Sequence, residues 1–310
     1  MELYFAPLEG IGTYTYRNTH AEMFGGCDGY YSPFITPSDK ARVVMKNLRD
    51  VIPEKNQGVN LTVQVITNKA DTFLKFEEKI KPLGYDTINI NLGCPSGTVV
   101  SKGRGAGFLT DPDGLDRFFD EIFSKTKMKI SVKTRTGFTS HDEMGRLMEI
   151  YNKYPLELLI VHPRTRAEQY NGMPNDEVFE MVYNISKNKL CYNGNIFSVE
   201  RYNEIVNRFP NLHSLMLGRG VVANPALFRE IRGGKKVEIS EISAFSQKLA
   251  EKYLEVLGSE RYTLNKLKET WFYVMWNYPE EKKIIKAIKK ADTLNDFLNV
   301  ITGIRLQERE

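Results

Sequence analysis

The chain has 310 residues, of which 41% are hydrophobic and 26% are charged, and its formal net charge is +4. This length suffices for a full α/β barrel with a small appendage, and the composition is ordinary for a globular protein. We expect no membrane-spanning helix, because the apolar runs are only strand-sized, and no secretory signal at the N-terminus. The small positive charge permits an acidic partner such as nucleic acid without requiring one.

Three cysteines are present, Cys27, Cys94 and Cys191, and none has the CxxC spacing of a metal site. We therefore expect no metal, and a reducing cytoplasm is the simplest location. Cys27 and Cys191 are interpreted as small buried side chains, the commonest role of a free cysteine. We also expect a monomer.

Short apolar runs alternate with helical patterns from the start of the chain to about Gly233. The predicted strands comprise residues 3–5, 30–31, 61–65, 87–92, 130–133, 158–162, 190–192 and 215–217. Several are apolar on both faces, as in buried parallel strands, and amphipathic stretches such as residues 113–123, 144–151 and 200–209 lie between them. Eight such units predict a (β/α)8 TIM barrel rather than an open doubly wound sheet.

No strand pattern follows Gly233-Gly234. Apolar residues recur there at helical spacing, in four stripes that begin at Ile242, Leu264, Ile284 and Leu294. The sequence therefore predicts a barrel domain over residues 1–235 and an all-helical domain over residues 236–310.

The chemically informative residues fall at the ends of the predicted strands, where barrel enzymes place their active sites. They are found in residues 6–10, 91–95, 133–137, 162–165, 193–195 and 218–220, together with Gln64. Gly218-Arg219-Gly220 follows the last strand and suits a phosphate, as does Asn193-Gly194-Asn195 before it, although tight turns would use the same glycines. Lys133 closes an apolar strand and needs an anionic partner, such as a reduced flavin.

These motifs, in this order, resemble those of the tRNA-dihydrouridine synthases over essentially the whole chain. The cysteine motif is residues 91–95 (NLGCP), and the lysine motif is residues 132–137 (VKTRTG). The histidine motif is residues 162–165 (HPRT), with Tyr170 and Gly172 at the family's distance, and the phosphate loop is residues 218–220 (GRG). One departure is Pro-Leu-Glu after the first strand, where many members have Pro-Met.

The resemblance implies an FMN-binding catalytic barrel, with NADPH as reductant, and an RNA-binding helical domain. FMN would bind with Pro7, Leu8 and Glu9 beside the ring, Gln64, Lys133 and His162 at its polar edge, and Asn193, Gly194, Asn195, Gly218 and Arg219 around the phosphate. Hydride would pass to C6 of a uridine in tRNA, Cys94 would protonate C5, and Asn91 and Arg164 would contact the substrate.

Other functions share parts of this pattern. An FMN barrel reductase could act on a free pyrimidine, ribosomal RNA could be the substrate, Lys133 could serve a Schiff-base aldolase, and the barrel could be a non-catalytic RNA-binding scaffold. Five lysines in residues 282–290 fit either a solvated helix face or an RNA-binding patch. Further basic candidates near the barrel mouth are Lys102, Arg104, Arg166, Lys266 and Lys268.

Overall fold

The computed structural model describes residues 1–38 and 48–304. Within these ranges, eight parallel strands form a closed barrel in sequence order. The barrel closes because β8 pairs with β1, with Leu3 opposite Leu215. The strands are β1 (Glu2–Phe5), β2 (Gly29–Tyr31), β3 (Leu61–Val65), β4 (Thr87–Leu92), β5 (Lys129–Arg135), β6 (Leu158–His162), β7 (Leu190–Tyr192) and β8 (Ser214–Leu217). The predicted barrel is confirmed, and its fifth strand runs two residues further than expected, to Arg135.

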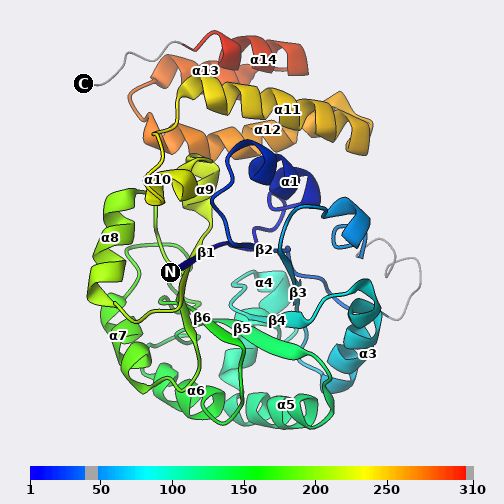
Figure 1. Ribbon diagram of the computed structural model, residues 1–310, viewed down its shortest axis with the longest axis vertical. Helices are drawn as coiled ribbons and strands as arrows, with labels where there is room; N and C mark the ends of the chain where they lie inside the picture. The colour runs from blue at the N-terminus through cyan, green and yellow to red at the C-terminus, as the bar shows by residue number, and fades with distance from the viewer. Residues whose placement is uncertain (39–47, 305–310) are drawn as a thin grey trace.

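Helices surround the barrel (Figure 1). They are α1 (Tyr14–Met23), α3 (Ala70–Ile80), α4 (Gly97–Val100), α5 (Pro112–Lys125), α6 (Glu143–Tyr151), α7 (Asp176–Ile185), α8 (Val199–Arg208), α9 (Arg219–Ala223) and α10 (Leu227–Ile231). Short 3-10 turns occur at η1 (Pro53–Lys55), η2 (Lys81–Leu83), η3 (Gly105–Thr110) and η4 (Met275–Asn277).

Helix α5 illustrates why these segments are helical. The Asp111 side chain caps the helix by accepting from the Gly114 amide, and Pro112 occupies the first turn, where its missing N–H costs nothing. The helix then buries a stripe at helical spacing against the barrel: Leu115, Phe118, Phe119 and Ile122.

The predicted C-terminal helices are present as α11 (Ile239–Leu257), α12 (Glu260–Val274), α13 (Lys282–Lys290) and α14 (Leu294–Thr302). They gather at one end of the molecule, beside α1, α9 and α10 (Figure 1). Phe245 of α11 packs edge-on against Tyr16 of α1, with ring centroids 5.4 Å apart. The same apolar core continues from the barrel into these helices, so they hold a fixed position beside the barrel mouth. The division at residue 235 into two functional domains stays a prediction.

No helix within residues 1–38 and 48–304 combines the length and the apolar character needed to cross a membrane.

Candidate active site

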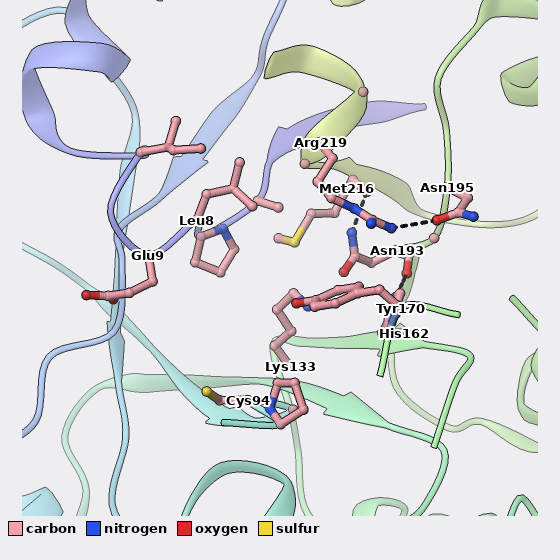
Figure 2. Close-up of a pocket in the computed structure, with 18 of the residues that line it drawn as sticks. Leu8, Glu9, Cys94, Lys133, His162, Tyr170, Asn193, Asn195, Met216 and Arg219 are labelled. Carbon is pink, nitrogen blue, oxygen red and sulfur yellow. Dashed lines mark hydrogen bonds between the residues drawn. The ribbon is translucent and has the colours of Figure 1, made fainter. Parts of the chain in front are cut away.

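A pocket of about 320 Å³ opens at the carboxyl ends of the strands (Figure 2). Most of the residues singled out in the sequence line it: Pro7, Leu8, Glu9, Asn91, Cys94, Lys133, His162, Asn193, Gly194, Asn195, Gly218 and Arg219. Figure 2 shows Glu9 and Cys94 toward one side of the pocket and Asn195 and Arg219 toward the other, with Lys133 between them. Of the residues expected to act in catalysis or to contact cofactor or substrate, Gln64 and Arg164 are the two that do not line it.

Cys94 is held by the loop that follows β4. The Asn91 side-chain oxygen accepts hydrogen bonds from the backbone N–H groups of Gly93, at 3.0 Å, and Cys94, at 2.9 Å. Gly105 packs against this loop with φ +55°, and a Cβ there would meet the Cys94 carbonyl at 2.9 Å. The Asn91 bonds and the Gly105 contact fix the position of the thiol at the pocket wall.

Burial raises the pKa of the Cys94 thiol above its ordinary value, and the nearby Glu9 carboxylate adds to the rise. Lys133 and Arg135 act in the opposite direction, but with smaller effect. The side chain is therefore a protonated thiol at neutral pH, and it can donate a proton to a bound molecule.

The expected contact of Gln64 with a cofactor has no counterpart in the pocket lining, because Gln64 lies below it in a buried ladder of side chains. Its amide donates to Asn89 at 2.8 Å and accepts from Asn91 at 2.8 Å. Asn89 in turn donates to Ser131 at 2.8 Å. Gln64 therefore supports Asn91, which holds the Cys94 loop, and its own polar groups are already satisfied.

Lys133 extends from β5 into the pocket (Figure 2). Burial, together with the nearby Arg135 guanidinium, lowers the pKa of its ammonium to about 8. Among the residues that the structure describes, no carboxylate is paired with this ammonium. The side chain is half-buried, and an unpaired cation in such a place favours an anionic ligand beside it.

His162 ends β6 and is neutral, because burial lowers its pKa well below the ordinary value. Its Nδ1 is hydrogen-bonded to the Asn193 carbonyl oxygen, which can only accept, so the proton lies on Nδ1. The Asn193 amide donates to the Met216 carbonyl at 2.7 Å. These bonds join the ends of β6, β7 and β8 along one wall of the pocket.

The loops after β7 and β8 meet at the far end of the pocket. Arg219 donates to the Asn195 side-chain oxygen at 2.9 Å, and Asn195 itself has φ +40°. Gly220 allows the two loops to touch, since a Cβ there would lie 1.9 Å from the Ile196 carbonyl oxygen. The result is a polar end with a guanidinium that can bind a phosphate.

The expected direct contact of Arg164 with a substrate also has no counterpart in the pocket lining, because its side chain is fully buried. Its guanidinium donates to the Asn171 and Gly172 carbonyl oxygens, at 3.1 and 2.5 Å. A further bond of 3.3 Å reaches the Asn195 side chain. Arg164 thus shapes the loop between β6 and α7 from beneath.

Four polar side chains to which the sequence analysis gave no role also line the pocket: Arg135, Tyr170, Glu269 and Tyr273. Arg135 donates to the Gly93 carbonyl at 2.8 Å, which adds a second support to the Cys94 loop. Arg135 and Tyr170 lie within the motifs quoted above, so their place in the chain was a usable signal. Glu269 and Tyr273 come from α12, and no motif marks them.

No group of three or more His, Cys, Asp or Glu side chains in the described part of the chain is placed to hold a metal ion.

Comparison with known proteins shows to which protein family this chain belongs. The family model described as "Dihydrouridine synthase (Dus)" matches residues 4–302. The "tRNA-dihydrouridine(16) synthase" of Pseudomonas putida is 25% identical over 305 residues, which cover 94% of both chains. A "Probable tRNA-dihydrouridine synthase" of Helicobacter pylori is 28% identical over 233 residues, or 74% of this chain and 70% of that protein.

Solved structures share the fold. Morphinone reductase superposes with a TM-score of 0.55 at 12% identity, over 79% of this chain and 88% of that one. The old yellow enzyme of Trypanosoma cruzi has a TM-score of 0.55 at 9% identity, over 76% and 89% of the two chains. Because the family model matches nearly the whole of this chain, the chain belongs to the dihydrouridine synthase family.

Proposed function

We propose that this chain reduces the C5–C6 double bond of specific uridines in tRNA to 5,6-dihydrouridine, with FMN as the bound cofactor and NADPH as the reductant. The observation that carries the proposal is the pocket itself, where a protonated thiol, Cys94, and an unpaired, half-buried cation, Lys133, line one cavity. The names of the family's relatives supply the substrate, tRNA.

The residues present suit FMN. The Lys133 ammonium would lie at the anionic edge of the reduced ring, and neutral His162 would add to that polar edge. Leu8 and Met216 give the pocket apolar surface for a flat ring. Arg219, oriented by Asn195, would bind the phosphate together with the backbone of Asn193, Gly194 and Gly218.

Bound FMN, once reduced by NADPH, would supply the hydride that adds to C6 of uracil. The addition places negative charge on the uracil enolate, and the Cys94 thiol would give its proton to C5. The resulting thiolate then regains a proton from water. Asn91 and Arg135 hold the Cys94 loop through the contacts described above, so their part is to position the acid.

The uridine must leave its stack to reach this pocket, because the lining residues lie at the strand ends inside the barrel mouth. Glu269 and Tyr273 of α12 line the pocket, so the C-terminal helices reach the barrel mouth. Their presence there suits a substrate larger than a free base. This favours RNA over a free pyrimidine.

The test uses purified protein supplied with FMN, NADPH and unmodified tRNA transcripts. We expect mass spectrometry to find dihydrouridine at defined positions, and free uridine or uracil to be poor substrates. Product from free pyrimidine but none in tRNA would refute the proposal. Product only in ribosomal RNA would show that ribosomal RNA, and not tRNA, is the substrate. A colourless protein that borohydride traps with a carbonyl compound would assign Lys133 to Schiff-base chemistry instead.

A further inference from the structure

A second hollow lies outside the barrel, between α12, η4 and α13. Its volume is about 540 Å³, within the range of roughly 300–1,000 Å³ usual for ligand pockets. Three buried side chains belong to its lining: Trp271, Met275 and Ile288. The more open part of the lining consists of Phe272, Trp276, Pro279 and Ile285, with Lys268 and Lys289 beside them. We refer to this hollow as the aromatic groove.

The aromatic groove presents two large rings to solvent. Phe272 is 56% exposed and Trp276 is 41% exposed. Their ring centroids are 5.6 Å apart at an interplanar angle of 71°. Exposed aromatic surface inside a concave site is typical of a place where a ligand or partner binds.

The charged residues that line the aromatic groove are positive. Two of its lining residues are lysines and none is acidic. Helix α13 carries further exposed lysines, Lys282, Lys283, Lys286 and Lys290, while Ile288 is buried. Lys268 donates to the Lys289 carbonyl at 3.0 Å, which fixes α12 and α13 beside each other. Stacking surfaces flanked by cations match single-stranded nucleic acid, whose bases offer flat faces and whose backbone is anionic.

The aromatic groove adjoins the barrel pocket. The Trp276 ring centroid lies 4.8 Å from that of Tyr273, and Tyr273 lines the barrel pocket. Trp276 also lies 5.7 Å from the guanidinium carbon of Arg219. One RNA molecule can therefore contact both places at once.

We infer that the aromatic groove receives an unpaired nucleobase of the same RNA whose uridine enters the barrel pocket. The base stacks on Phe272 or Trp276, and Lys289 contacts a neighbouring phosphate. This inference rests on the proposed function for its substrate, and it adds a second recognition point, which selects RNA with an unpaired residue at a fixed distance from the target uridine.

The first test compares Phe272→Ala with Tyr262→Ala in the full-length protein. Both rings are exposed on α12, at 56% and 63%, but Tyr262 does not line the aromatic groove. Fluorescence anisotropy with a labelled tRNA transcript measures Kd. We expect Phe272→Ala to weaken binding about 5- to 100-fold, the value of one stacked base, and Tyr262→Ala to leave it unchanged. Equal Kd values for the two variants and the wild type would overturn the inference.

A second test reads stacking directly. The chain has two tryptophans, and Trp271 is fully buried whereas Trp276 is exposed. We expect the tRNA transcript to quench tryptophan emission, a fully paired RNA stem to do so much less, and Trp276→Phe to abolish the quench. Equal quenching by both RNAs would mean that no unpaired base is bound.

The salt dependence of Kd tests the phosphate contact of Lys289 separately from base stacking. Lys289→Gln is expected to lower the slope of log Kd against log salt by about one. Lys127→Gln, at an exposed position before β5, is expected to leave that slope unchanged. A slope unaltered by Lys289→Gln would remove the phosphate contact from the inference.

Failure of the inference is distinguishable from failure of the proposed function. Wild-type protein that forms dihydrouridine in tRNA, together with a Phe272→Ala variant of normal Kd, would overturn the inference alone. Wild-type protein that forms none would overturn the function, while the quench still reports on the groove. A dimer in sedimentation that Phe272→Ala dissociates would assign the groove to a second copy of the chain.

Discussion

The guanidinium carbon of Arg219 lies 4.6 Å from the centre of the Tyr170 ring. A second cation, Arg135, has its guanidinium carbon 5.2 Å from the centre of the same ring. Tyr170 is 53% exposed, so two cations, rather than apolar packing, hold the ring over the pocket. The contact joins the loop after β6 to the polar end formed by the loop after β8.

Replacing Arg219 with alanine is expected to weaken FMN binding by about 10- to 100-fold, because a hydrogen bond to a charged group contributes about 1.5–3 kcal/mol. The Kd of Arg219→Lys for FMN is expected to lie between those of the wild type and Arg219→Ala, since lysine keeps the charge but lacks the planar guanidinium. Flavin fluorescence quenching measures Kd. Arg208→Ala is the matched control, because Arg208 pairs with Glu180 on the outer helices. Unchanged flavin affinity in Arg219→Ala would contradict the phosphate-binding role.

Replacing Cys94 with alanine is expected to lower dihydrouridine formation by about 10²- to 10⁴-fold, the usual contribution of a general acid. Reduction of the flavin by NADPH is expected to continue, because that step needs no proton from this thiol. Stopped-flow absorbance follows the flavin, and mass spectrometry follows the product. Cys27→Ala is the control, since the Cys27 thiol donates a hydrogen bond to the Gly29 carbonyl oxygen and does not line the pocket. A Cys94→Ala variant with wild-type product rates would refute the assignment.

The pH dependence of product formation follows from the same thiol. Burial raises the pKa of Cys94, so the acid form persists through neutral pH and is lost only as pH rises through the raised pKa. We therefore expect a plateau at neutral pH and a decline in alkali. The residual rate of Cys94→Ala is expected to lack that alkaline decline. An alkaline limb of the same position in both proteins would show that another group titrates there.

The fold was predictable because each strand is marked by its own short run of apolar residues in the sequence. Even the short β2 is marked by Tyr30 and Tyr31, and the apolar residues of α12 mark it as a helix without reference to its neighbours. The place of Cys94 and Lys133 at the pocket was predictable because a barrel brings the carboxyl ends of its strands to one rim.

The hydrogen-bond partners of individual side chains were not predictable. Gln64 is bonded to Asn89 and Asn91 on the neighbouring strand β4, and its contact with a cofactor stays a prediction. Arg164 lies in the right loop, but the loop folds back so that its carbonyl groups surround the guanidinium. Glu269 was missed because only tertiary packing brings α12 to the barrel mouth.

Replacing Gln64 with leucine is expected to destabilise the protein by about 2–6 kcal/mol, since Asn89 and Asn91 each lose a buried partner worth about 1–3 kcal/mol. Urea unfolding measures the change. Gln247→Leu is the control, because Gln247 is exposed on α11. A Gln64→Leu protein of normal stability that has lost its flavin affinity would instead favour direct contact with the cofactor.

Replacing Lys133 with methionine is expected to stabilise the protein in the absence of flavin and to weaken flavin binding. The pKa of Lys133 is about 8 in the folded chain and 10.5 ordinarily, so the unfolded chain holds more protons between these values. The free energy of unfolding therefore rises with pH from about 8 to 10.5, and the cost of the buried charge is fully present below pH 8.

At pH 7 the gain from Lys133→Met is about 1–3 kcal/mol, which gives a higher Tm without flavin. Lys129→Met on the same strand is the control. The Lys129 ammonium is exposed and makes a long ion pair of 3.7 Å with Asp86, so its loss is expected to change stability by less than about 0.5 kcal/mol. Calorimetry without FMN tests the expected gain in stability, and calorimetry with FMN tests the expected loss of flavin binding. A Lys133→Met protein with a lower Tm in the absence of flavin would show that the ammonium has a stabilising partner, and that the anion it needs is not the cofactor.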